Sequence, residues 1–297
     1  MSAGPDRRVV VITGASSGIG RSAAHQLATE GAALVLAARS PETLEQVRQE
    51  CLARGASEVL VRVTDVGRGD EVDALVADGT GLGEVEGVIH SAGVLAYGRF
   101  VEVPAEDFDR VLQTNVVGAA NVARSALRVF EGQGRGSLVV IGSVLGKIAT
   151  PYMSNYVTSK WALQGLVRAL QIETRAQRGV HVTLLTPGGV DTPIYDQAGS
   201  YLGRPGHPPP PVVSPEKVAA AAVRALRKPG RDVPVGSVNW LMVTGFRLLP
   251  GVFDVLVTPM MRVLGLGRSG ADVGPGNVHE PRPAGEAVHG RWPHVWG

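Results

Sequence analysis

Tyr156 and Lys160 are spaced so that a helix would place a phenol beside an ammonium. They are the first and last residues of the pentad Tyr-Val-Thr-Ser-Lys at 156–160, and residues four apart lie on the same face of a helix. A phenol has an ordinary pKa of about 10, and a positive charge within ~4–6 Å favours its ionised form. Such a pair could exchange a proton near neutral pH. Two side chains on an ordinary exposed helix face are the alternative, which the pentad alone leaves open.

A glycine-rich turn at 13–20 follows the first apolar run and precedes a helical pattern at 21–30. Glycines let the backbone approach a ligand closely, and a helix N-terminus offers free N–H groups and a partial positive charge to a pyrophosphate. A plain turn is the alternative, but a position between strand and helix is the context of a phosphate site. The residues expected to hold the phosphates are Gly14, Ser16, Ser17, Gly18, Ile19 and Gly20.

Arg39 follows the second apolar run, where NAD-selective folds place an acid for the ribose 2′-hydroxyl. An arginine presents a fork of donors suited to a 2′-phosphate. Arg39 with Ser40 therefore predicts NADP(H) over NAD(H), and a surface arginine that caps the next turn is the alternative. Asp65 and Val66, after the third run, are expected at the adenine edge, unless Asp65 is an ordinary turn aspartate.

The elements that must position these residues alternate between short apolar runs and helical stretches. Runs rich in Val, Ile and Leu without polar alternation are typical of parallel strands covered on both faces. Repeated βα units predict an α/β fold with a doubly wound sheet. The expected strands are 9–12, 34–38, 59–63, 85–89, 138–141 and 180–185.

Composition excludes several classes of protein. The 297 residues carry 29 basic and 27 acidic side chains, for a net charge of +2, and these are interspersed, which disfavours nucleic-acid binding. The single cysteine, Cys51, cannot form an intramolecular disulfide, and no signal-peptide apolar region precedes the first strand, so we expect a cytoplasmic protein. No metal is expected, because His279, His289 and His294 match no ligand spacing.

With these motifs in view, residues 8–236 resemble the short-chain dehydrogenase/reductase family of the compact one-domain type. The resemblance implies a single Rossmann-like domain with a mainly parallel seven-stranded sheet, in which 232–236 is the last strand. It also implies hydride transfer between a nicotinamide and a carbonyl or alcohol. The matching motifs are Thr-Gly-x-x-x-Gly-Ile-Gly at 13–20, Thr-Asn-Val at 114–116, Val-Val-Ile-Gly-Ser at 139–143, Tyr156, Lys160, and Pro-Gly-Gly-Val-Asp-Thr at 187–192.

The family's roles carry over residue by residue. Tyr156 would be the general acid/base, Lys160 would lower the pKa of Tyr156 and bind the nicotinamide ribose, and Ser143 would hold the substrate oxygen. Asn115 would shape its helix so that a backbone carbonyl holds a water of a proton relay. The residues expected around the nicotinamide are Ala92, Gly93, Pro187, Gly188, Val190 and Thr192.

One motif departs from the family pattern. The family commonly has Asn-Asn-Ala-Gly after the fourth strand, and this chain has His-Ser-Ala-Gly at 90–93. The Ala-Gly pair is kept, so cofactor binding is expected to persist. His90 either replaces the sheet-bracing hydrogen bonds of the first asparagine or merely packs; a catalytic role is a further alternative.

The chain is expected to divide into the Rossmann-like domain at 1–236, an apolar helical extension at 237–266, and a Gly/Pro-rich, poorly ordered tail at 267–297. Pro250 and Gly251 split the extension into two helices. Its apolar stretches are too short to span a bilayer. The extension could cover the active-site mouth or a subunit interface, lie in a membrane interface, or close on the domain. Together with the loop at 194–213, we expect it to line a pocket for an apolar substrate.

The sequence thus predicts an NADP(H)-dependent oxidoreductase acting on the CH–OH or carbonyl group of a hydrophobic small molecule. A non-catalytic NADP(H)-binding sensor on the same fold is one alternative, and a peripheral membrane-associated reductase is another. The resemblance implies a homodimer or homotetramer built from the two long helices. The substrate and the direction of the reaction are not encoded in any motif.

Overall fold

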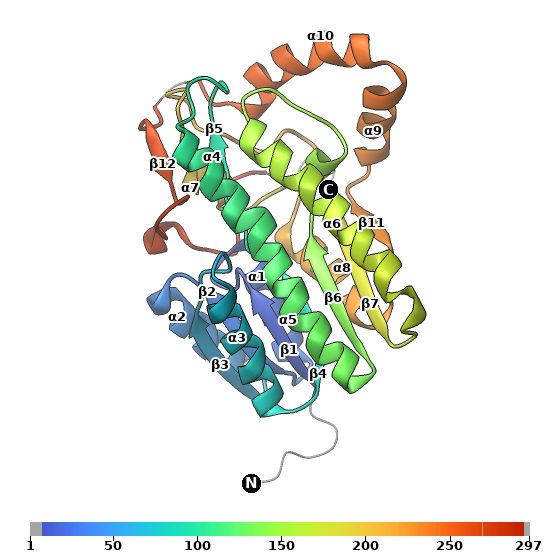
Figure 1. Cartoon of the computed structure of the whole chain (residues 1–297). Coiled ribbons are helices and arrows are strands. Elements are labelled where there is room, and N and C mark those ends of the chain that lie inside the picture. The colour runs from blue at the N-terminus through green and yellow to red at the C-terminus, as the bar shows by residue number, and fades with distance from the viewer. Residues whose placement is uncertain (1–7, 269, 294–297) are drawn as a thin grey trace.

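A seven-stranded parallel sheet forms the centre of the computed structural model, which describes residues 8–268 and 270–293 (Figure 1). The strand order is β11-β7-β6-β4-β1-β2-β3. The doubly wound α/β fold and the seven-stranded sheet predicted from the sequence are confirmed. The strands are β1 (Val9–Thr13), β2 (Ala33–Ala38), β3 (Glu58–Val63), β4 (Val85–His90), β6 (Gly136–Ile141), β7 (Val180–Pro187) and β11 (Asp232–Val235).

Helices cover both faces of the sheet, which explains the uninterrupted apolar runs in the strands. Every residue of β1, β2 and β6 is buried, because each strand face packs against a helix layer. One layer contains α1 (Gly18–Thr29), α2 (Pro41–Ala53) and α8 (Pro215–Arg227). The other contains α3 (Gly69–Leu82), α5 (Gly118–Gln133) and α6 (Ser154–Glu173).

The strand order reverses beside β1: β2 and β3 are added on one side of it, and β4 and the later strands on the other. Such a switch point leaves a crevice at the carboxyl ends of the strands, where open α/β sheets bind ligands. The glycine turn follows β1 and Ser143 follows β6, so both lie at this edge. Long helices bring further residues to the same edge: α4 (Ala105–Leu112) continues through a π-helical turn (Gln113–Val117) into α5.

The apolar extension forms two helices, α9 (Asn239–Leu248) and α10 (Pro250–Met260), and a π-helical turn (Met261–Gly265). The break falls at Leu249 and Pro250, next to the expected split. In Figure 1 both helices stand above the carboxyl edge of the sheet. Among the residues that the structure describes, no helix is long and apolar enough to cross a membrane.

The loop at 194–213 and the C-terminal tail come together beside this edge. The loop contains α7 (Ile194–Gln197), β9 (Ala198–Ser200) and β10 (Val212–Val213), which pairs with β8 (Gly189–Val190). Strand β12 (Gly274–Gly276) pairs antiparallel with β9, and β9 pairs with β5 (Ala96–Tyr97). The tail was expected to be poorly ordered because of its composition. Among its described residues, β12 pairs with β9 and Val278 is buried; His294 lies outside these residues.

Candidate active site

Tyr156 and Lys160 lie one turn apart on α6 and face the same cavity as Ser143. The Lys160 Nζ atom is 5.3 Å from the centre of the Tyr156 ring. It donates a hydrogen bond to the Ile141 carbonyl oxygen (3.1 Å), at the end of β6. The three side chains named by the sequence therefore meet at one place, where a hydroxyl, a phenol and an ammonium border a single cavity.

Burial moves the pKa values of the pair in opposite directions. It raises the pKa of Tyr156 to about 12, although the hydrogen bond with Ser143 lowers it. Burial lowers the pKa of Lys160 to about 8. The sequence led us to expect a lowered pKa for the phenol, and the shift in this structure is upward because removing a phenolate from water outweighs the stabilising contacts. A phenol that keeps its proton at neutral pH is suited to donate it.

Asn115 supports the site from the π-helical turn between α4 and α5, a type of turn that is frequent at functional sites. Its amide exchanges two hydrogen bonds with the backbone of Val94, both 2.9 Å long, and donates a third to Ser159 Oγ (2.9 Å). Ser159 Oγ in turn donates to the Tyr156 carbonyl oxygen (2.7 Å). Asn115 thus fixes α6 relative to the loop after β4, and it lines neither cavity.

The cavity in front of Tyr156 is lined mainly by apolar side chains. The extension contributes Met242, Met260 and Met261, and the loop contributes Tyr195 and 209–211. Tyr97, which is buried, and Tyr195, which is partly buried, add two phenols, and desolvation raises the pKa of each. We did not predict these two tyrosines from the sequence, because they lie in short elements that carry no motif.

The glycine turn forms a tight cradle beside this cavity. Gly14 has φ of +67°, and a Cβ atom there would lie 2.7 Å from the Ala92 backbone nitrogen. A Cβ atom on Gly20 would lie 2.2 Å from the Gly14 carbonyl oxygen. Only glycine permits this approach of β1, α1 and the loop after β4. The turn, with the N-terminus of α1 above it, fits the phosphates of a dinucleotide.

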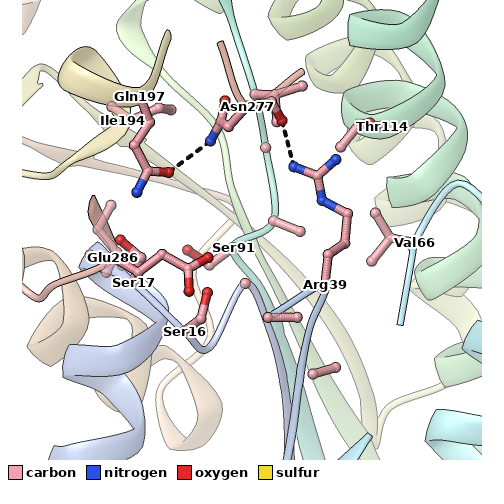
Figure 2. A pocket seen from close by; sticks show the side chains of 18 of the residues that line it. Ser16, Ser17, Arg39, Val66, Ser91, Thr114, Ile194, Gln197, Asn277 and Glu286 are labelled. Atoms are coloured by element: carbon pink, nitrogen blue, oxygen red, sulfur yellow. Dashed lines mark hydrogen bonds between the residues drawn. The ribbon is translucent and has the colours of Figure 1, made fainter. Parts of the chain in front are cut away.

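A cleft runs from this cradle along the carboxyl ends of β1, β2 and β3 (Figure 2). Pro187, Gly188, Val190, Tyr156 and Lys160 border the neighbouring cavity instead. The predicted cofactor residues that line the cleft are Gly14, Ser16, Ser17, Gly18, Ile19, Arg39, Asp65, Val66, Ala92, Gly93 and Thr192. Ile19, Gly93 and Thr192 line both spaces. The cleft and the cavity are therefore continuous, and a dinucleotide in the cleft would end beside Tyr156.

Gly20 and Ser40 do not line the cleft directly. Gly20 lies in the first turn of α1 behind the cradle. Asp65 lines the cleft, but its carboxylate is paired with Arg110 and accepts the Gly67 N–H (2.9 Å). Val66 next to it offers an apolar wall.

Arg39 is half-buried and bonded to the C-terminal tail. Its Nη1 atom donates to the carbonyl oxygens of Val278 (3.1 Å) and His279 (2.9 Å), and its Nη2 atom donates to that of Asn277 (2.6 Å). Ser40 Oγ donates to Glu286 Oε1 (2.8 Å). Asn277 and Glu286 both line the cleft. No sequence signal pointed to these two residues, since they lie about 240 positions from the side chains they contact.

His90 braces two strands. Its Nδ1 atom is 2.8 Å from Thr13 Oγ1, so the ring links β4 to β1. Burial lowers the pKa of His90 to about 3, and the Lys160 charge adds to the effect. The Nε2 atom is buried and has no hydrogen-bond partner among the described residues. The ring is therefore neutral at ordinary pH and takes over the bracing expected of an asparagine.

The parallel fold, the glycine cradle and the facing serine, tyrosine and lysine together define a class of nicotinamide-binding oxidoreductases. The sequence pattern of the family described as short chain dehydrogenase matches residues 8–201. The chain belongs to this family.

Individual relatives agree with this assignment. The chain is 34% identical to the oxidoreductase YxnA of Bacillus subtilis over 86% of its own length and 72% of the relative's. It is 32% identical to dehydrogenase/reductase SDR family member 7B of Bos taurus, over 86% and 81% of the two chains. Among solved structures, an alcohol dehydrogenase from the archaeon Thermococcus sibiricus, complexed with 5-hydroxy-NADP, is 31% identical with a TM-score of 0.66. The match covers 77% of this chain and 95% of that one.

Proposed function

We propose that this protein is an NADP(H)-dependent oxidoreductase that interconverts a carbonyl and a hydroxyl group on an apolar small molecule. The observation that carries this proposal is the meeting of Ser143, Tyr156 and Lys160 where the dinucleotide cleft opens into an apolar cavity. A nicotinamide bound there supplies or accepts the hydride. The protein's own residues must then hold the substrate oxygen and move one proton.

Each of the three side chains has a role that its position supports. Tyr156, protonated at neutral pH because of burial, donates its proton to a ketone oxygen during reduction and takes it back during oxidation. Ser143 holds the same oxygen by hydrogen bonding. Lys160, anchored to the Ile141 carbonyl, binds the nicotinamide ribose, and its ammonium is placed to replenish the proton of the phenol. Thr192 and the backbone at 187–190 orient the nicotinamide amide.

The choice of NADP(H) rests on Arg39 and Ser40 at the end of β2. Neither sequence neighbour of Arg39 is an acid that could bind a ribose 2′-hydroxyl. The Arg39 guanidinium borders the cleft. A forked guanidinium binds a phosphate better than it binds a ribose hydroxyl. The solved relative from T. sibiricus is complexed with an NADP derivative, which is consistent with this choice.

The apolar substrate is inferred from the lining of the cavity. Leu95, Leu145 and Ile148 come from the domain itself, and three methionines come from the extension. Methionine fills irregular spaces and adapts to different ligands. The extension therefore serves as one wall of the substrate site. Residues 237–266 are accordingly proposed as an addition to the 1–236 domain that determines which alcohols or ketones fit.

Substitution of Tyr156 by Phe tests the reaction. We expect turnover of any accepted ketone to fall by about 10²–10⁴-fold, the usual contribution of a general acid, while NADPH binding is retained. Tyr152→Phe is the matched control, because it removes a phenol hydroxyl that lies outside the cavity and contacts Arg262. A ketone screen followed by nicotinamide absorbance gives both rates. Equal activity of Tyr156→Phe and wild type would overturn the mechanism.

Association with a membrane surface is a second candidate for the extension. Trp240, Leu248 and Val255 on α9 and α10 are 69%, 73% and 72% exposed, and arginine-bearing amphipathic helices bind lipid interfaces. Flotation with anionic lipid vesicles, compared between wild type and Trp240→Ser/Val255→Ser, decides this point. The cytoplasmic location and the homodimer or homotetramer remain predictions, to be tested by fractionation and light scattering.

A further inference from the structure

Residues 277–287, which we call the crossing segment, connect Arg39 on one side of the cofactor cleft to the start of α1 on the other. Asn277 and Glu286 of this segment line the cleft (Figure 2). At one end their backbone carbonyls face the guanidinium. At the other end the Ala287 carbonyl oxygen accepts the Gly18 N–H (2.8 Å) and the Ser17 hydroxyl (3.0 Å). The crossing segment therefore contacts both groups of donors that the phosphates of a dinucleotide would use.

At Arg39 the contact engages both terminal nitrogens. Three consecutive carbonyl oxygens, those of residues 277–279, accept hydrogen bonds from Nη1 and Nη2. Figure 2 shows the guanidinium directed at Asn277 and away from the cradle. A phosphate that used the same fork would have to replace these carbonyls, because a guanidinium has a limited number of N–H donors in a rigid geometry.

Glu286 adds a negative charge to the same part of the cleft. Its Oε1 atom accepts a hydrogen bond from the Ser40 hydroxyl (2.8 Å). Its Oε2 atom is buried and has no hydrogen-bond partner among the described residues. A carboxylate here repels a 2′-phosphate, whereas its free oxygen can accept a hydrogen bond from an unmodified ribose hydroxyl. The charge of Glu286 would therefore act against a 2′-phosphate and not against a free 2′-hydroxyl.

The crossing segment is held in place by contacts outside the cleft. The Val278 side chain is 0% exposed and packs with Val94 and Val111. His279 Nε2 lies 2.6 Å from Asp107 Oδ1, and the Asn277 amide donates to Gln197 Oε1 (2.9 Å). These anchors hold the three carbonyls against Arg39.

We propose that the crossing segment competes with the 2′-phosphate of NADP(H) for Arg39 and Ser40, and so sets how strongly the enzyme prefers NADP(H) over NAD(H). This inference rests on the proposed role of Arg39 as the 2′-phosphate ligand. When a 2′-phosphate binds, the carbonyls of 277–279 and the Glu286 carboxylate leave the fork and the hydroxyl. NAD(H) binding requires no such displacement at Arg39.

Two full-length variants weaken the contact in different ways. Glu286→Gln removes the carboxylate charge and keeps the shape of the side chain, whereas Val278→Ser removes the buried anchor. Asp272→Asn is the matched control, because Asp272 is an exposed carboxylate of the same C-terminal tail and is not among the charges that act on Arg39 or bond to Ser40. Circular dichroism and thermal unfolding establish that each variant folds.

The readout is nucleotide binding measured by calorimetry, with adenosine 2′,5′-bisphosphate and adenosine 5′-monophosphate as probes. We expect Glu286→Gln and Val278→Ser to raise the affinity for the bisphosphate about tenfold, which is ~1.4 kcal/mol, and to change the affinity for the monophosphate by less than about twofold. We expect the control to change the ratio of the two affinities by less than either variant.

Comparison of Arg39→Ala with Arg39→Ala/Glu286→Gln tests whether the increase in bisphosphate affinity depends on the guanidinium. We expect Glu286→Gln to give no increase when Arg39 is absent. The inference is overturned if folded Glu286→Gln and Val278→Ser keep the wild-type ratio, if they weaken bisphosphate binding, or if the gain persists without Arg39. Because these titrations need no turnover, failure of this inference is distinguishable from failure of the proposed reaction, which Tyr156→Phe tests.

Discussion

Replacement of Lys160 by Met should stabilise the folded protein at neutral pH and abolish its activity. Burial lowers the pKa of Lys160 from 10.5 to about 8. One pKa unit corresponds to ~1.4 kcal/mol, so keeping this ammonium charged inside the fold destabilises the native state by ~3 kcal/mol at about pH 7. Methionine has a similar length and no charge.

The gain is offset in part by a lost hydrogen bond. Without the ammonium, the Ile141 carbonyl oxygen loses a donor at 3.1 Å, and a buried acceptor left without its partner costs ~1–3 kcal/mol. We therefore expect a net increase of ~0–2 kcal/mol in the free energy of unfolding at about pH 7. The same substitution removes the charge from the site, which is the usual conflict between stability and function.

The stability difference between Lys160→Met and wild type should depend on pH. The folded-state pKa lies below the unfolded one, so the wild-type penalty is fully present below pH 8 and disappears as pH rises towards 10.5. The advantage of the variant should therefore shrink by ~2 kcal/mol between about pH 7 and about pH 10. Urea unfolding followed by tryptophan fluorescence measures it, with Lys217→Met as the control at an exposed lysine. A variant less stable than wild type at neutral pH, or an advantage that does not change with pH, would refute the reasoning.

Three further substitutions test the surroundings of the site. Gly20→Ala should destabilise the protein by ~1–3 kcal/mol, as overpacking does, because its Cβ would lie 2.2 Å from the Gly14 carbonyl oxygen. It should also weaken NADPH binding. Unchanged thermal unfolding and an unchanged NADPH titration would contradict the tight packing of the glycine turn. Asn115→Leu removes a side chain that makes three buried hydrogen bonds and should cost ~1–3 kcal/mol per unpaired group in urea unfolding; a loss under ~1 kcal/mol would be too small for this bracing role. Wild-type stability should fall as pH drops from 6.5 towards about 3, because the unfolded chain binds a proton at His90 that the folded chain does not. His90→Asn should remove this part of the acid dependence, and identical slopes for the two proteins would show that His90 is not its source.

Much of the fold could be predicted from local patterns. The apolar runs identified six strands because a strand covered on both faces needs continuous Val, Ile and Leu, and each strand forms at that place. Ser214 and Pro215 are residue types typical of a helix start, and the Ser214 hydroxyl accepts the Lys217 N–H (3.3 Å) at the start of α8. These features depend on neighbours within a few residues, so they can be predicted from the sequence alone.

The electrostatics of the site could not be predicted in the same way. The spacing of Tyr156 and Lys160 places them together, but the upward shift of the phenol pKa depends on burial by residues from distant parts of the chain. Desolvation depends on everything around a group in three dimensions. The spacing alone suggested a shift in the opposite direction.

The sequence by itself determined the class of site: a glycine turn after a first strand, a serine at a strand end, and a tyrosine and lysine one helical turn apart. Only the tertiary structure decided what surrounds them. It packed the methionines of the extension and two further tyrosines against the cavity, and it brought Asn277 to Arg39 across 238 positions of sequence. Local spacing encodes which groups can react because helices and strands repeat regularly, whereas contacts between distant segments arise only when the whole chain packs.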